Sequence, residues 1–145
     1  METLFSILHV VTGVFIVGPM AILPMTGLRS VRAREAGQVN NLTKSISVFT
    51  LLSLVVVLFG FALLGMSGYS FSTTWVLLSV ILYAIALALN LFLVVPALRQ
   101  AAENIIETAG TGATGKVAGY SRIAAGSGVV SLLLVAVVVL MVWRP

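Results

Sequence analysis

Four long apolar stretches alternate with three more polar segments along the chain. They cover about residues 4–25, 46–66, 75–98 and 123–143. Each has the roughly 20 residues that a helix needs to cross about 30 Å of hydrocarbon. Backbone in lipid must satisfy its own hydrogen bonds, so even the valine-rich stretches are predicted to be helices. We therefore predict an all-α fold, an integral membrane four-helix bundle made of two hairpins that forms a single transmembrane domain over residues 1–145.

The first apolar stretch has an alternative interpretation, a cleaved signal peptide. Its leading residues, Met1-Glu2-Thr3, carry no basic group, and the stretch runs on without an A-x-A cleavage pattern. Both features differ from those of a secretory signal. We predict a retained first helix.

Composition excludes an ordinary soluble domain. Hydrophobic residues make up 60% of the chain and charged residues 8%, with a mean hydropathy of +1.18, whereas soluble domains carry roughly 25% charged residues. The chain has no cysteine, which excludes disulfides and thiolate metal sites. The net charge of +4 would suggest nucleic acid for a soluble protein, but here the basic residues must first be placed relative to a membrane.

Basic residues are distributed unequally between the two sides of the predicted membrane. The segments 27–45 and 99–122 hold seven of the eight, namely Arg29, Arg32, Arg34, Lys44, Arg99, Lys116 and Arg122. Only Arg144 is predicted to lie on the opposite side. Because Lys and Arg are enriched in cytoplasmic loops, we predict that both segments are cytoplasmic links and that the topology is N-out and C-out in the inner (plasma) membrane. The same seven side chains are expected to contact anionic phospholipids.

The stretch GTGATGKV, Gly110 to Val117, fits the first seven positions of a phosphate-binding loop. Such a loop follows a strand and ends in Ser or Thr, which holds magnesium. Here a short helical stretch precedes it, and Val117 stands at the Ser/Thr position. We interpret it as a flexible linker whose Lys116 lies at the lipid headgroups, and predict no nucleotide and no nucleic-acid partner.

Ionisable chemistry inside the predicted spans is limited to one side chain. Intramembrane charges are the usual markers of transport or proton relay, yet none of the four glutamates lies within a span. His9 is the one candidate, as an interhelical hydrogen-bond donor or as a haem or metal ligand completed by another protein, because the chain has no second His and no Cys. We predict no catalytic residue, no enzymatic activity and no cofactor of its own.

Small and polar residues form stripes at helical spacing. One stripe contains Ser79, Tyr83, Ala86 and Asn90, another contains Ser6, His9 and Gly13, and a third contains Ser47, Thr50 and Ser53. In lipid such stripes are typical of helix–helix contacts, and a polar substrate cavity is the alternative. Gly18-Pro19 is expected to kink the first helix. From Leu132 onward the fourth helix is apolar on every side and faces lipid or another protein.

A weak internal repeat joins the ends of the first and third spans. Pro24 precedes Arg29 at the end of the first, and Pro96 precedes Arg99 at the end of the third. Two hairpins of the same orientation would form a parallel duplication. Chance similarity between apolar segments is the alternative.

The stretch HVVTGVFIVGPM, His9 to Met20, followed by Leu28-Arg29-Ser30, resembles the first hairpin of small four-helix membrane proteins of actinobacteria. One group of these proteins accompanies the cytochrome bcc–aa3 respiratory supercomplex as an association factor. The resemblance implies a non-catalytic accessory or assembly subunit whose partners are other integral membrane subunits. The alternatives are a haem- or metal-binding four-helix protein that uses His9 and a small oligomeric transporter.

Overall fold

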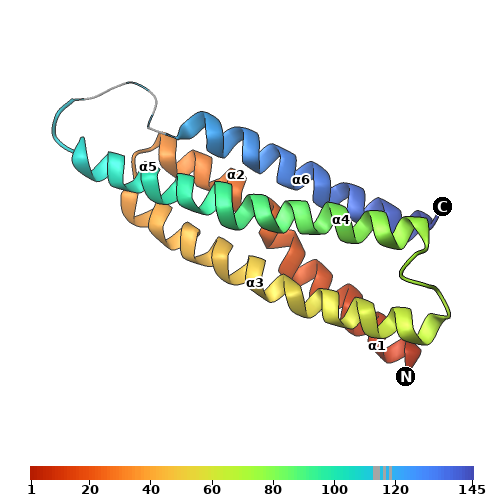
Figure 1. The fold of residues 1–145 in the computed structure, drawn as a ribbon. Helices are drawn as coiled ribbons and strands as arrows, with labels where there is room; N and C mark the ends of the chain where they lie inside the picture. The colour runs from red at the N-terminus through yellow and green to blue at the C-terminus, as the bar shows by residue number, and fades with distance from the viewer. Residues whose placement is uncertain (113–114, 116, 118) are drawn as a thin grey trace.

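The protein consists of four long helices in a computed structural model that describes residues 1–145 except 113–114, 116 and 118 (Figure 1). The elements are α1 (Glu2–Thr12), η1 (Gly13–Val17), α2 (Gly18–Arg32), α3 (Ala36–Ser67), α4 (Thr74–Leu89), η2 (Asn90–Val94), α5 (Val95–Glu107) and α6 (Tyr120–Trp143). The turns η1 and η2 are π-helical insertions, so the rods run from 2 to 32, 36 to 67, 74 to 107 and 120 to 143. All four are long and apolar enough to cross a membrane. The predicted all-α membrane fold is confirmed, and the chain is a multi-pass integral membrane protein.

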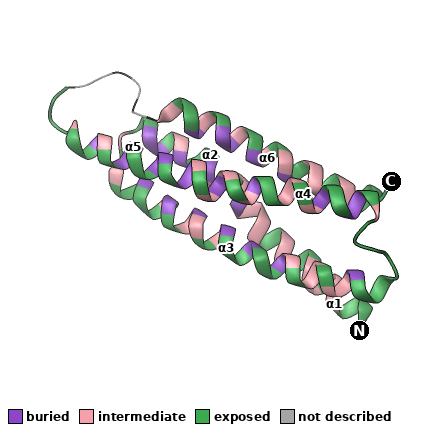
Figure 2. Cartoon of the chain, viewed as in Figure 1, coloured by how far each residue is buried: buried purple, intermediate pink, exposed green. Residues whose placement is uncertain are grey.

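The helices form two hairpins that meet at one end of the molecule. Within each hairpin α1 packs against α3 and α4 packs against α6, whereas α2 and α5 connect the pairs. Figure 1 shows the pairs close together at the α5 end and diverging toward the end that carries both termini. None of the residues of α1 is buried, and Figure 2 shows exposed and half-buried residues along it. The N-terminal part of the first helix, α1, is therefore attached mainly to α3.

The helices run past the predicted spans at the α5 end. The segment 27–45, predicted as a link, is largely helical with a tight turn at residues 33–35, and residues 99–107 and 120–122 of the other predicted link are helical too. The 34-residue rod from 74 to 107 is about 51 Å long at 1.5 Å per residue, roughly 20 Å more than the hydrocarbon core. We name the projecting part, residues 27–46, 94–107, 117 and 119–123, the head.

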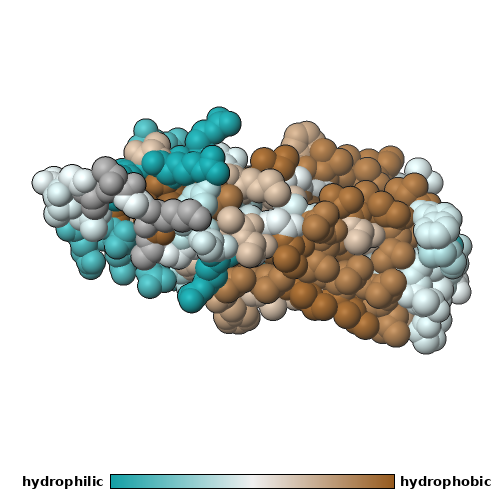
Figure 3. All heavy atoms as spheres, turned by 90° about the horizontal axis from the view of Figure 1, so that it is seen from above, coloured by the Kyte–Doolittle hydropathy of each residue, from teal (hydrophilic) through white to brown (hydrophobic). Residues whose placement is uncertain are grey.

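The head has a hydrophobic core of its own. Its buried residues are Val31, Val39, Ile46, Val94, Val95, Ala97, Leu98, Ala101, Ala102, Ile105, Val117 and Ile123. On α5 they recur with helical spacing, so one face of this helix packs inward while Arg99 and Glu103 are exposed. Gly27 lies against α5, where a Cβ would be 3.2 Å from Leu98 Cδ2. Figure 3 shows the corresponding surface, an apolar belt bordered by hydrophilic residues at the α5 end.

We predict that the head lies on the cytoplasmic side of the membrane, and this can be tested by labelling. The chain has no cysteine, so single cysteines at the exposed positions Ala109 and Ser70 give labelling without background. The basic residues near the head predict that Ala109→Cys is cytoplasmic and Ser70→Cys external. A membrane-impermeant maleimide added to intact cells should label only Ser70→Cys. If only Ala109→Cys is labelled, the topology is the opposite of the predicted one.

Candidate functional site

Two π-turns stand before prolines at corresponding places in the first and third helices. The N–H of Gly18 bonds to the carbonyl of Gly13, and the N–H of Val95 bonds to the carbonyl of Asn90. The next residue is proline in both cases. A proline lacks the N–H and its ring collides with the carbonyl four residues before it. A π-turn, which is common at functional sites, widens the helix where that collision would occur.

The two π-turns also align two segments of similar sequence. The sequence GVFIVGP at residues 13–19 corresponds to NLFLVVP at residues 90–96, with Phe, Val and Pro in common. The structural equivalence therefore pairs Pro19 with Pro96, whereas the sequence comparison had paired Pro24 with Pro96. Asn90 takes the place of Gly13 in this register, so the third helix carries a polar side chain where the first has none.

Asn90 links three helices at the centre of the bundle. It is fully buried, and its Nδ2 donates to Thr50 Oγ1 at 3.2 Å and to the Met20 carbonyl at 3.5 Å. Met20 stands four residues before Pro24. Because proline has no N–H, the Met20 carbonyl has no donor at the usual helical position. Asn90 supplies that missing donor from another helix.

More polar atoms surround this centre. Ser131 Oγ on α6 donates to the Ala21 carbonyl at 2.9 Å. Among the described residues, Asn90 Oδ1 and Ser127 Oγ are buried without a hydrogen-bond partner. An unpaired buried polar atom costs roughly 1–3 kcal/mol. The centre therefore has hydrogen-bonding capacity that the described side chains do not use.

Tyr83 and Ser53 connect α4 to α3 near this polar centre. Ser53 Oγ bonds to the Thr50 carbonyl and also to the Tyr83 hydroxyl. Because a carbonyl only accepts, Ser53 donates to Thr50, and the Tyr83 hydroxyl donates to Ser53. Two residues of the predicted stripe, Tyr83 and Asn90, thus bond to α3. Its other members, Ser79 and Ala86, are buried, and Ser79 bonds within its own helix to the Trp75 carbonyl at 2.7 Å.

His9 faces α3 in the N-terminal half of the first helix. Its Nδ1 lies 2.8 Å from the Val56 carbonyl, which can only accept, so Nδ1 carries the proton and Nε2 is left as an acceptor. Gly60 makes this approach possible, because a Cβ there would be 2.9 Å from His9 Cε1. Gly13 lies on the same side, where a Cβ would be 3.9 Å from Val56 Cγ1, and Ser6 is half-buried.

Adding a methyl group at Gly60 should displace the histidine. We expect Gly60→Ala to break the His9–Val56 bond and to lower the free energy of unfolding by about 1 kcal/mol, the typical value of one such bond. The measurement is denaturation in mixed detergent micelles. Gly65→Ala is the matched control, because a Cβ at Gly65 meets nothing within 4 Å. Equal stability of the two variants would contradict the packing role of His9.

The chemistry available at these groups is hydrogen bonding. In the part of the chain that the structure describes, no three His, Asp or Glu side chains are grouped to hold a metal ion. Sequence reasoning identified Asn90, Tyr83 and His9 but missed Met20, Ser127 and Ser131. The sequence signals that could have identified them are Pro24, four residues after Met20, and the four-residue spacing of Ser127 and Ser131.

The basic residues predicted to contact lipid have several different surroundings. Arg32 Nε donates to Tyr120 Oη at 2.6 Å, with its guanidinium 5.5 Å from the ring centre. Arg34 donates to the Gly115 carbonyl at 2.7 Å and to Thr108 Oγ1 at 3.3 Å. Arg32 thus binds the start of α6, and Arg34 binds the segment that joins α5 to α6.

The remaining basic residues lie elsewhere. Arg29 and Arg122 are exposed, and Lys44 and Arg99 line a pocket between α3 and α5. Lys116 lies outside the described residues.

Comparison with known proteins gives one match. A family model described as "Predicted integral membrane protein (DUF2269)" matches residues 3–145. No curated protein and no solved structure matches the chain.

Proposed function

We infer that this chain, which belongs to the DUF2269 family of predicted integral membrane proteins, is a non-catalytic accessory subunit of a larger assembly in the plasma membrane. The observation that carries this proposal is the weak attachment of α1 and η1, the N-terminal part of the first helix, which have no buried residue and contact mainly α3. Their exposed residues include Val10 (62%), Val14 (63%) and Phe15 (70%). A helix that packs on one neighbour leaves most of its surface for lipid or for a partner.

The polar groups within the spans support the same proposal. Asn90, Tyr83 and His9 all bond to atoms of neighbouring helices, so they stabilise the bundle. Polar residues that line a transport pathway face water or one another across a cavity. The outer surfaces are apolar by contrast, and an assembly subunit needs only spans, internal packing and such surfaces.

The partner that we propose is a respiratory assembly, the cytochrome bcc–aa3 supercomplex. Its support is the resemblance of the stretch from His9 to Met20 to the first hairpin of actinobacterial association factors. In such an assembly the chemistry would belong to the partner subunits, and this chain would hold them together. Its deletion should make the assembly less abundant while the isolated enzymes keep their activity.

Co-purification from native membranes in a mild detergent tests the proposal. Respiratory subunits should be enriched with the tagged full chain, and Phe15→Ala should reduce that enrichment. Phe92→Ala is the matched control, because Phe92 occupies the equivalent position of the repeat and is 80% exposed. A chain that purifies alone, or that carries solute flux in liposomes, would contradict the accessory role.

His9 supports a second candidate, a haem- or metal-binding role. Its Nδ1–H bonds to a backbone carbonyl and leaves Nε2 as an acceptor, which is how ligating histidines are commonly oriented. A partner would have to supply the other ligands. An absorbance spectrum of the purified assembly distinguishes the two, because a Soret band lost in His9→Ala would favour ligation.

A further inference from the structure

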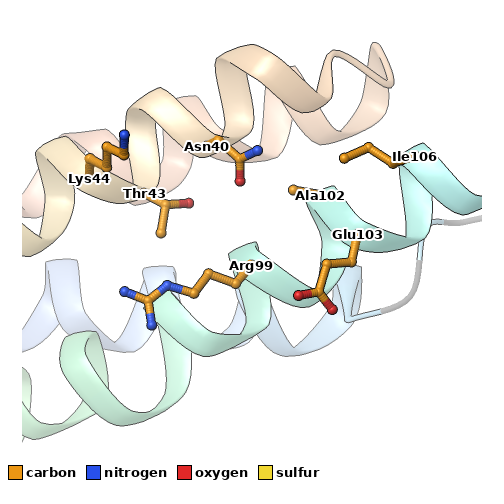
Figure 4. Close-up of a pocket in the computed structure, with 7 residues that line it drawn as sticks. All are labelled: Asn40, Thr43, Lys44, Arg99, Ala102, Glu103 and Ile106. Carbon is orange, nitrogen blue, oxygen red and sulfur yellow. The ribbon is translucent and has the colours of Figure 1, made fainter.

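A pocket of about 430 Å³ lies between α3 and α5 on the surface of the head. Its lining residues are Asn40, Thr43, Lys44, Arg99, Ala102, Glu103 and Ile106. Figure 4 shows Lys44 and Arg99 at one end of the pocket, on different helices, and Ile106 at the other. The pocket is thus lined by two cations, an amide, a hydroxyl and one carboxylate.

The pocket lies at the border of the apolar belt. Lys44 stands two residues before the span predicted to begin at Ile46, and Arg99 directly follows the span predicted to end at Leu98. Figure 3 shows the change from apolar to hydrophilic surface at this end of the belt. Side chains at this depth meet the phosphate groups of the lipid.

Apolar side chains continue from the pocket toward the middle of the membrane. Val48 (54% exposed) and Leu51 (54% exposed) follow Lys44 by four and seven residues on α3. Residues at these spacings share a helix face, so both side chains lie below the pocket. An acyl chain attached to a group in the pocket would run over them. A free anion would make no use of this surface.

The charges in the pocket select the kind of headgroup. Two cations against one carboxylate leave one positive charge, which matches the single negative charge of a phosphodiester. Lys and Arg are the side chains that bind phosphate oxygens. The Glu103 carboxylate and the Asn40 amide oxygen are acceptors, which suits hydroxyl groups beyond the phosphate.

We propose that this pocket binds an anionic phospholipid with a hydroxylated headgroup, such as phosphatidylglycerol. The phosphodiester binds to the exposed Lys44 and Arg99 side chains that line the pocket, the headgroup hydroxyls bond to Asn40 or Glu103, and one acyl chain lies along Val48 and Leu51. The site belongs to this chain alone. It does not depend on the identity of a protein partner.

Native mass spectrometry of the purified full chain tests the site. The probes are phosphatidylglycerol and phosphatidylcholine with identical acyl chains, and inorganic phosphate alone. One phosphatidylglycerol should bind more tightly than phosphatidylcholine. The double substitution Lys44→Gln and Arg99→Gln should weaken it by more than about tenfold, because it removes both charge-assisted bonds to the phosphate.

The matched control is the double substitution Arg29→Gln and Arg122→Gln. It removes the same charge from two exposed residues at the same end of the molecule that do not line the pocket, and should change binding less than twofold. If both double variants lose lipid affinity equally, the lipid is held by general attraction to surface charge and the proposal is overturned. Competition by inorganic phosphate at the lipid's own concentration would identify a free-anion site, and equal binding of phosphatidylcholine would exclude anion selectivity; either result also overturns it.

Discussion

Replacing Gly126 with leucine is expected to separate α6 from the third helix and to destabilise the bundle by about 1–3 kcal/mol, the usual effect of overpacking. A Cβ at Gly126 would be 3.0 Å from Leu93 Cδ2 and 3.1 Å from Val94 Cγ2. Val94 is fully buried within η2, so the added side chain cannot be accommodated by a shift toward lipid. The free energy of unfolding is measured in mixed micelles from the fluorescence of Trp75 and Trp143.

Gly128 provides the control on the same helix. A Cβ there meets nothing within 4 Å, so Gly128→Leu makes the same change in composition and helix propensity without the collision. Its stability should stay within about 0.5 kcal/mol of the parent or rise slightly, because leucine is the better helix former. Similar losses in both variants would mean that α6 does not pack closely on η2.

The four spans could be predicted from the sequence because the membrane imposes a simple rule. A stretch of about 20 apolar residues must become a helix in lipid, whatever its intrinsic propensity. The valine-rich part of α6 illustrates this, since Val137 to Val139 would favour a strand in water. The length and spacing of the apolar stretches therefore predicted the fold class.

The packing of the head was not predicted, although a short helical stretch was expected before the glycine loop. The inward face of α5 consists of Ala97, Leu98, Ala101, Ala102 and Ile105. Polar residues between them lower the mean hydropathy, so residues 99–107 lie outside the predicted span. The spacing i, i+1, i+4, i+5, i+8 is nevertheless typical of a packed helix face. Basic residues assign the link 99–122 to the cytoplasmic side. That rule gives the side of a segment but not its structure.

The polar centre was predicted in part. Asn90 and Tyr83 were placed on one stripe because their spacing follows the helix. Their bonding partners depend on how the helices are rotated and how deeply they lie against each other, which one chain's periodicity does not define. The Met20 carbonyl is a particular case. The pattern of side chains does not show an unpaired backbone carbonyl. Only the proline four residues later indicates it.

The pairing of Asn90 with that carbonyl makes a specific prediction about Pro24. We expect Asn90→Leu to lower the free energy of unfolding by roughly 0.5–2 kcal/mol, the range of interhelical polar contacts in membranes. Pro24→Ala restores an N–H four residues after Met20, so the Met20 carbonyl gains an intrahelical donor. In the Pro24→Ala background, Asn90→Leu should therefore cost less, by about 0.5–1 kcal/mol. A double-mutant cycle measures this difference directly.

Thr50→Val is the control that separates this effect from general loosening of the bundle. Thr50 is buried and accepts the other hydrogen bond of Asn90, at 3.2 Å, but this bond involves no group that Pro24 frees. Its loss should cost the same with proline or alanine at position 24. If Pro24→Ala reduces the cost of both substitutions equally, the proline acts by relaxing the helix. If it reduces neither, Asn90 does not serve as the donor for the Met20 carbonyl, and the polar centre is held by its side-chain bonds alone.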